Sequence, residues 1–244
     1  MQNNIIQTPI YLINRISKSG LDLINEIENT QTRIIEEKKN TLLLNEFWGK
    51  NNDIRVTIFN RFLTFLFSTK LSLIFIETNL MDNNWWKLNF RDLQTKDIYQ
   101  HTKEFETWSK HHFGLSIFIQ TEYFTRKILR SIDPSACSNA TSDFKSVYET
   151  LLSKIDINYP EAKNLYNLLR LVRNTIHNDG IYRNRYSNNE IVTYKGVEYS
   201  FLHDCLIDFV TWNFLIDITN DIVQLIKEII FNKNVANISD NIND

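Results

Sequence analysis

The segment 164–182, which reads NLYNLLRLVRNTIHNDGIY, contains the residue types that a site for phosphate chemistry needs. On a helix with 3.6 residues per turn, Arg170, Arg173 and His177 lie within an arc of about 60°. Asn174 lies beside them. A guanidinium group matches phosphate oxygens, and an imidazole can transfer protons near neutral pH. The spacing therefore predicts phosphate binding next to a proton-transfer group. Alternatively, these cations only stabilise the negative end of a helix.

Further basic and aromatic residues follow this segment. Residues 161–195 contain six basic and three acidic residues, whereas the whole chain has a formal net charge of −2. This local excess favours a surface that faces phosphates, although an ordinary solvated loop would have a similar composition. Tyr182 and Tyr186 could stack on unpaired bases. They could equally belong to the core or to the rim of a site.

The stretch RLVRNTIHNDG resembles the motif of HEPN-domain proteins, which are helical bundles with an arginine, four to six residues and then a histidine. Six residues separate Arg170 from His177, but the apolar Leu171 follows that arginine. Arg173 is followed by the expected polar Asn174, but only three residues separate it from His177. Either arginine could therefore be the family arginine. The resemblance covers about residues 98–231.

The resemblance implies a metal-independent endoribonuclease that acts in a toxin–antitoxin or anti-phage defence system. Such an enzyme would use the 2′-OH of RNA as the nucleophile and leave a 2′,3′-cyclic phosphate. It would need no cofactor, and single-stranded RNA or tRNA would be the substrate. It would form a homodimer that pairs two motifs across one cleft, and an antitoxin or a defence protein could be a further partner.

The resemblance also assigns roles to individual residues. The expected catalytic residues are Arg170, Arg173, Asn174 and His177. Apart from the resemblance, the local charge and the tyrosines of this region favour RNA binding by Asn178, Tyr182, Arg183 and Arg185. An inactive HEPN-like module that binds RNA, a nucleotide or a protein is the alternative. A third possibility is a helical interaction protein in which His177 is packed or ion-paired. Arginines neutralised by acids of the same chain would weaken the nuclease interpretation.

The elements that would position these residues are mostly helical. The periodicity predicts helices over 9–39 (one helix, or two that break near Gly20), 54–79, 98–131, 143–152, 160–178 and 203–231. Alternation around Lys195-Gly196 predicts a β-hairpin over 190–201. Residues 80–97 are expected to be an irregular connection with buried tryptophans, and residues 135–142 a loop. The fold class is therefore an all-α, HEPN-like helical bundle with one hairpin before the last long helix.

Three regions are expected: an N-terminal helical accessory region over 1–97, a HEPN-like bundle over 98–231 and a frayed polar tail over 232–244. The most apolar stretch, 58–76, contains Asn60, Arg61 and Lys70, so we expect a buried helix and no membrane span.

Composition excludes several classes of protein. The chain is 43% hydrophobic and 13% aromatic, and its 244 residues include five glycines and three prolines. These values exclude disordered and collagen-like chains, and the net charge excludes a globally basic nucleic-acid binder. Cys137 and Cys205 are too few for a disulfide framework and are expected to be small buried residues. The histidine spacing favours no metal site, and the N-terminus lacks a signal peptide, so a cytoplasmic location is expected.

Overall fold

The computed structural model describes residues 10–90, 92–136 and 143–243, with side chains from Gly20 onward. In chain order its elements are α1 (Ile10–Leu44), α2 (Phe47–Lys50), α3 (Ile54–Phe75), the π-helical turn η1 (Ile76–Leu80), α4 (Asn83–Asn89), α5 (Thr95–Ile132), α6 (Phe144–Lys154), α7 (Ala162–Ile176), β1 (Glu190–Tyr194), β2 (Val197–Phe201), α8 (Trp212–Phe231) and α9 (Lys233–Ala236). The prediction of an all-α bundle with a hairpin before the last long helix is confirmed.

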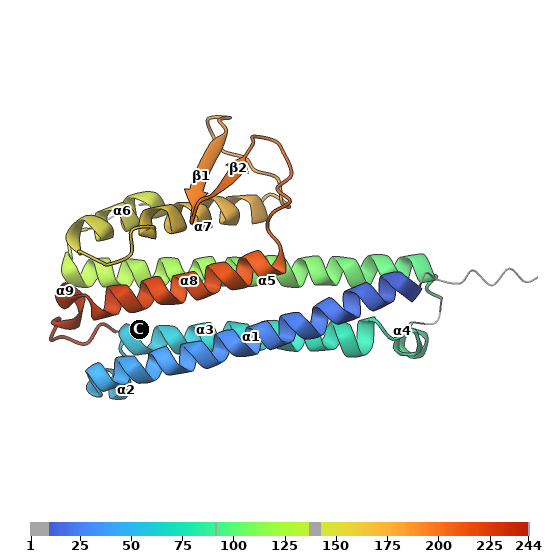
Figure 1. Cartoon of the computed structure of the whole chain (residues 1–244), viewed down its shortest axis with the longest axis horizontal. Coiled ribbons are helices and arrows are strands. Elements are labelled where there is room, and N and C mark those ends of the chain that lie inside the picture. Colours follow the sequence, from blue (N-terminus) through green and yellow to red (C-terminus); the bar gives the residue numbers. More distant parts are fainter. Residues whose placement is uncertain (1–9, 91, 137–142, 244) are drawn as a thin grey trace, which may run out of the picture.

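The longest helix, α5, is the centre of the bundle. It packs against α3 on one side, against α6 and α7 on the other, and also against α8 (Figure 1). Helix α1 packs against both α3 and α8, and the hairpin β1–β2 contacts α7. One cluster of buried apolar residues includes members from α1 through α9. The expected accessory region, 1–97, and the expected bundle, 98–231, therefore share one core. The division of the chain near residue 97 stays a prediction.

Local sequence signals explain most helix ends. The Asp143 side chain accepts a hydrogen bond from the Ser146 N–H and caps α6. Gln94 and Asp97 form a capping box at the start of α5. In the hairpin turn, Lys195 and Gly196 both have positive φ angles, 49° and 76°, which suit a two-residue turn. The helix α1 runs through Gly20 without a break.

Two predicted segments differ from the structure. The connection 80–97 contains the helix α4, in which Trp86 is buried and Trp85 half-buried. The predicted helix over 203–231 begins only at Trp212, because the Thr211 side chain caps α8 there. Residues 203–211 are not helical, and Leu206 forms an isolated bridge with Ile181 instead. Backbone groups of Asp204, Cys205 and Ile207 form hydrogen bonds with the chain that follows α7.

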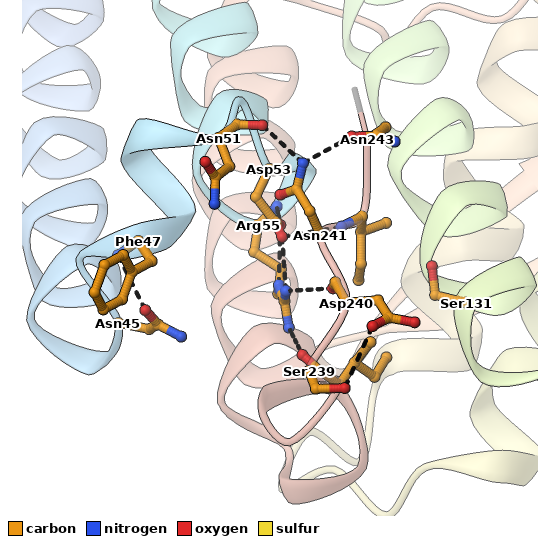
Figure 2. A network of polar contacts seen from close by, with 12 residues as sticks. Asn45, Phe47, Asn51, Asp53, Arg55, Ser131, Ser239, Asp240, Asn241 and Asn243 are labelled. Carbon is orange, nitrogen blue, oxygen red and sulfur yellow. Dashed lines mark hydrogen bonds and ion pairs between the residues drawn. The ribbon is translucent and has the colours of Figure 1, made fainter.

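The prediction of a frayed tail is wrong. Val235 and Ile242 are buried, and the tail surrounds Arg55, whose side chain is fully buried (Figure 2). The Arg55 guanidinium donates hydrogen bonds to both carboxylate oxygens of Asp53, at 2.9 and 2.6 Å. It also donates to backbone carbonyls of the tail, those of Val235, Ile238 and Asp240. A buried charge needs such partners, and these fix the position of the tail.

Two further expectations concern cysteines and the membrane. Cys205 is exposed, so the prediction of a buried thiol is wrong there, while Cys137 and most of the loop 135–142 lie outside the described residues.

Within the described residues, one helix, Ile54–Leu80, is long and apolar enough to cross a membrane, and its most apolar window is 39% buried. This helix packs against α1 and α5. The cytoplasmic location stays a prediction.

Candidate functional site

Helix α7 has one apolar face and one polar face. The leucines Leu165, Leu168, Leu169 and Leu171 are buried in the core, whereas Arg170 and Arg173 are only half-buried. The helix ends where Asp179 adopts a left-handed conformation (φ 52°) and the Gly180 N–H donates to the Thr175 carbonyl at 2.8 Å. This is the hydrogen bond of a Schellman motif. His177 is the C-cap residue, directly after the last residue of the helix, and it is exposed.

The polar face of α7 forms one wall of a cleft of about 520 Å³. The other walls come from the start of α6, from the segment after α7 and from the start of β1. The lining residues are Asp143, Lys145, Arg170, Arg173, Asn174, His177, Asn178, Arg183, Asn184, Arg185, Tyr186 and Glu190. Five of these side chains are cationic and two are carboxylates. A cleft with this charge excess raises the local concentration of anions.

Seven of the eight site residues expected from the sequence line this one cleft. The exception is Tyr182, whose side chain is fully buried. Its ring packs against Phe201 with centroids 5.4 Å apart, and its hydroxyl donates to Glu190 Oε1. Burial and the hydrogen bond to Glu190 raise the pKa of the Tyr182 hydroxyl to about 12. Tyr182 therefore cannot stack on a base, and the expected RNA-binding role of this residue is wrong.

The two arginines of α7 have different surroundings. Arg170 donates to Glu190 Oε2 at 2.8 Å and to Asn167 Oδ1 at 2.9 and 3.1 Å. It therefore connects α7 to the first residue of the hairpin. Arg173 lies over the Phe118 ring, 5.3 Å from its centroid, and contacts the Asn174 amide oxygen at 3.3 Å. Within the described part of the chain, Arg173 forms no ion pair, so its charge is available to a ligand.

His177 is exposed at the edge of the cleft and forms no ion pair with any described residue. Partial desolvation lowers the pKa of its imidazole, and the nearby positive charge of Arg173 lowers it further. A neutral imidazole at pH 7 can accept a proton. If this segment were only a helix end, His177 would be packed or ion-paired. In the structure His177 is exposed and has no ion pair among the described residues. Asn178 donates to the Asn174 carbonyl at 2.8 Å, which satisfies a carbonyl at the helix end.

The loop after Tyr182 is held by Asn184. Its amide oxygen accepts from the N–H groups of Tyr186 and Asn188, at 2.9 and 3.2 Å. Its amide nitrogen donates to the Tyr182 hydroxyl and to the Asn188 carbonyl, at 2.9 and 2.7 Å. The ends of the loop are thus tied together, and the side chain of Arg185 is exposed. In the same loop, Arg183 pairs with Asp204 at 2.9 Å, which partly neutralises it.

Sequence reasoning missed four lining residues: Asp143, Lys145, Asn184 and Glu190. Asp143 also caps α6. The pKa of its carboxyl is lowered by the hydrogen bond from the Ser146 N–H and also by the charge of Arg170. The spacing of the motif cannot indicate Lys145 or Glu190, because these residues belong to α6 and β1. Within the described residues, no group of three or more His, Cys, Asp or Glu side chains could hold a metal ion.

Comparison with known proteins adds no relative. No family model matches the chain, and no curated protein or solved structure matches it either.

Proposed function

We propose that the cleft beside α7 is the active site of a metal-independent endoribonuclease. The observation that supports this most directly is the convergence of Arg173, Asn174 and His177 with the loop cations in one cleft. Arg173, which forms no ion pair with a described residue, and the exposed His177 have the chemical character that phosphate binding and proton transfer need. The HEPN resemblance of the motif gives the same reaction class.

The reaction would use groups that RNA and this chain supply. His177 takes the proton from a 2′-OH, and the 2′-oxygen then attacks the adjacent phosphorus. The bond from phosphorus to the 5′-oxygen breaks, and that oxygen receives a proton from water or from the imidazolium of the partner's His177. The products are a 2′,3′-cyclic phosphate and a 5′-hydroxyl end. DNA is not cut because it lacks the nucleophile.

Arg173, and not Arg170, is the arginine that we assign to the phosphate. Arg170 is engaged by Glu190 and Asn167, so it positions the hairpin against α7. The guanidinium of Arg173 has no acidic partner among the described side chains and can stabilise the charge that develops on the phosphate. Loss of one such donor typically costs about 10²- to 10³-fold in rate. The proposal therefore takes Arg173 as the phosphate-binding arginine of the motif, although only three residues separate it from His177.

The substrate and the biological setting are part of the same proposal. The size of the cleft and its excess of cations suit a segment of single-stranded RNA or a tRNA loop. A homodimer would bring a second His177 to the reaction and supply the acid that one chain lacks. A toxin or anti-phage role, with an antitoxin or defence partner in the cytoplasm, follows from the HEPN resemblance.

A catalytically inactive module that binds RNA or a nucleotide is the second candidate. The ion pair between Arg170 and Glu190 favours it, because one of the two motif arginines is neutralised within the chain. This candidate keeps the anion-binding cleft but not the reaction. Binding without cleavage, with the same affinity for RNA and for the matching DNA strand, would identify it.

Cleavage of a labelled single-stranded RNA and of bulk tRNA in EDTA tests the proposal. The wild-type protein should cut and leave cyclic phosphate ends, and His177→Ala should lose about 10²- to 10⁴-fold in rate. His112→Ala is the matched control, because His112 is also exposed but stacks on Trp108 of α5, outside the cleft. Absence of cutting by a folded wild-type protein, or equal rates for the two variants, would contradict the proposal.

A further inference from the structure

One tyrosine on the rim of the cleft differs from the others nearby. The Tyr186 side chain is 65% exposed, whereas that of Tyr182, four residues earlier, is fully buried. The guanidinium of Arg185 lies 4.4 Å from the centroid of the Tyr186 ring and contacts its hydroxyl. Both residues line the cleft that contains His177. A large aromatic side chain is thus presented to solvent beside a site for phosphate.

The backbone that carries this ring is held by hydrogen bonds within the loop. Asn184 accepts from the Tyr186 N–H and bonds to both backbone groups of Asn188, so it closes the turn on each side of the ring. Asn184 is in turn anchored to the buried Tyr182 hydroxyl. A ligand that stacks on Tyr186 would therefore find a backbone that is already ordered, which reduces the entropic cost of binding.

We propose that Arg185 and Tyr186 form a stacking platform for one unpaired base of the RNA, and that this platform restricts the site to single-stranded RNA. The guanidinium covers one face of the ring, and a base can stack on the other face while its phosphate enters the cationic cleft. A base within a duplex already has neighbours on both faces and cannot use the platform. This inference rests on the proposed function, since it assigns the substrate class of that cleft.

Binding measured without cleavage tests the platform. The protein is the full chain with His177→Ala, and the probe is a fluorescent single-stranded RNA of about 12 nucleotides, alone or annealed to its complement. Tyr186→Ala should weaken binding of the single strand by about 5- to 150-fold and leave binding of the duplex unchanged. Tyr186→Trp should retain binding, because an indole ring also stacks on a base.

A matched control lies elsewhere on the molecule. Tyr99 on α5 is also exposed and also has a cation near its ring, the Lys103 ammonium at 5.8 Å, but it does not line the cleft. Tyr99→Ala should leave binding of both probes unchanged. Equal weakening for single strand and duplex, no effect of Tyr186→Ala, or no binding of either probe would overturn the platform. Tyr186-dependent binding together with an inactive wild-type protein would instead overturn only the ribonuclease.

Discussion

Replacement of Arg55 tests how strongly the C-terminal tail holds the bundle together. Arg55→Met removes a fully buried guanidinium but keeps an apolar side chain of similar length over Trp48, whose ring centroid lies 4.0 Å from the guanidinium. The change leaves the Asp53 carboxylate without its cationic partner in a site that has no exposed surface. It also removes the hydrogen bonds from Arg55 to three tail carbonyls, of which only that of Val235 keeps another donor, the Ile238 N–H.

The expected cost follows from these contacts. Removal of one partner of a buried ion pair typically destabilises a protein by about 3–5 kcal/mol. The carbonyls of Ile238 and Asp240, which lose the Arg55 donor, place the expected loss of unfolding free energy near the upper end of this range. For a chain of this size, such a loss lowers the melting temperature by roughly 6–20 °C. Thermal and urea unfolding followed by circular dichroism would measure both quantities.

Two further variants separate the buried pair from a general effect of mutation. Asp53→Asn combined with Arg55→Met removes both charges and keeps a residue that can cap α3, so the double variant should lose less stability than the sum of the single variants. Lys50→Ala removes an exposed ion pair with Glu46 and should change stability by less than about 0.5 kcal/mol. A loss of less than 1 kcal/mol for Arg55→Met would refute the reasoning.

Three other perturbations have clear expected outcomes. Hydrogen bonds from Lys154 and Ser135 hold the pKa of Asp133 well below its usual value. The ionised carboxylate therefore stabilises the fold above about pH 4, and this stabilisation disappears as the pH falls toward the lowered pKa. Asp133→Asn should make the unfolding free energy depend less on pH in this range. Arg173→Gln should raise the pKa of His177 toward its ordinary value, because the positive charge of Arg173 is one of the two causes that lower it. NMR titration of the imidazole would measure this pKa. An unchanged pKa would mean that Arg173 is too far from His177 to affect it. Gly196→Ala should lower the free energy of unfolding in urea by about 1 kcal/mol, because Gly196 has a φ of 76° that strains an alanine. The new methyl group itself meets no atom within 4 Å. An unchanged free energy would mean that the turn adapts.

The sequence predicts α7 and its polar face well because the relevant information is local. Helical periodicity places the leucines on one side and Arg170, Arg173 and His177 on the other, and the turn at Asp179 ends the helix within two residues of the histidine. The hairpin is equally local, since alternation and the Lys195-Gly196 turn define its register. These signals do not depend on what the rest of the chain does.

Several of the errors share one cause, which is contact with a distant segment. Tyr182 is buried because its backbone pairs with Asp204 and Cys205, more than twenty residues later, so it lies beneath the loop and not in it. The same pairing keeps residues 203–211 out of the predicted helix. Glu190 of β1 and Lys145 of α6 line the cleft, and the spacing of residues within the motif does not indicate this. Tertiary structure, and not local propensity, decides these positions.

The buried arginine also has a consequence for the order of events during synthesis. Arg55 and its carbonyl acceptors in the tail are separated by 180 to 185 residues of chain. At the usual speed of translation, roughly 10–40 s pass between the appearance of the guanidinium and that of its acceptors. Until then the N-terminal helices contain a charge that cannot be buried at low cost. The final packing around Arg55 at the start of α3 therefore depends on residues 235–240, which are synthesised long after it.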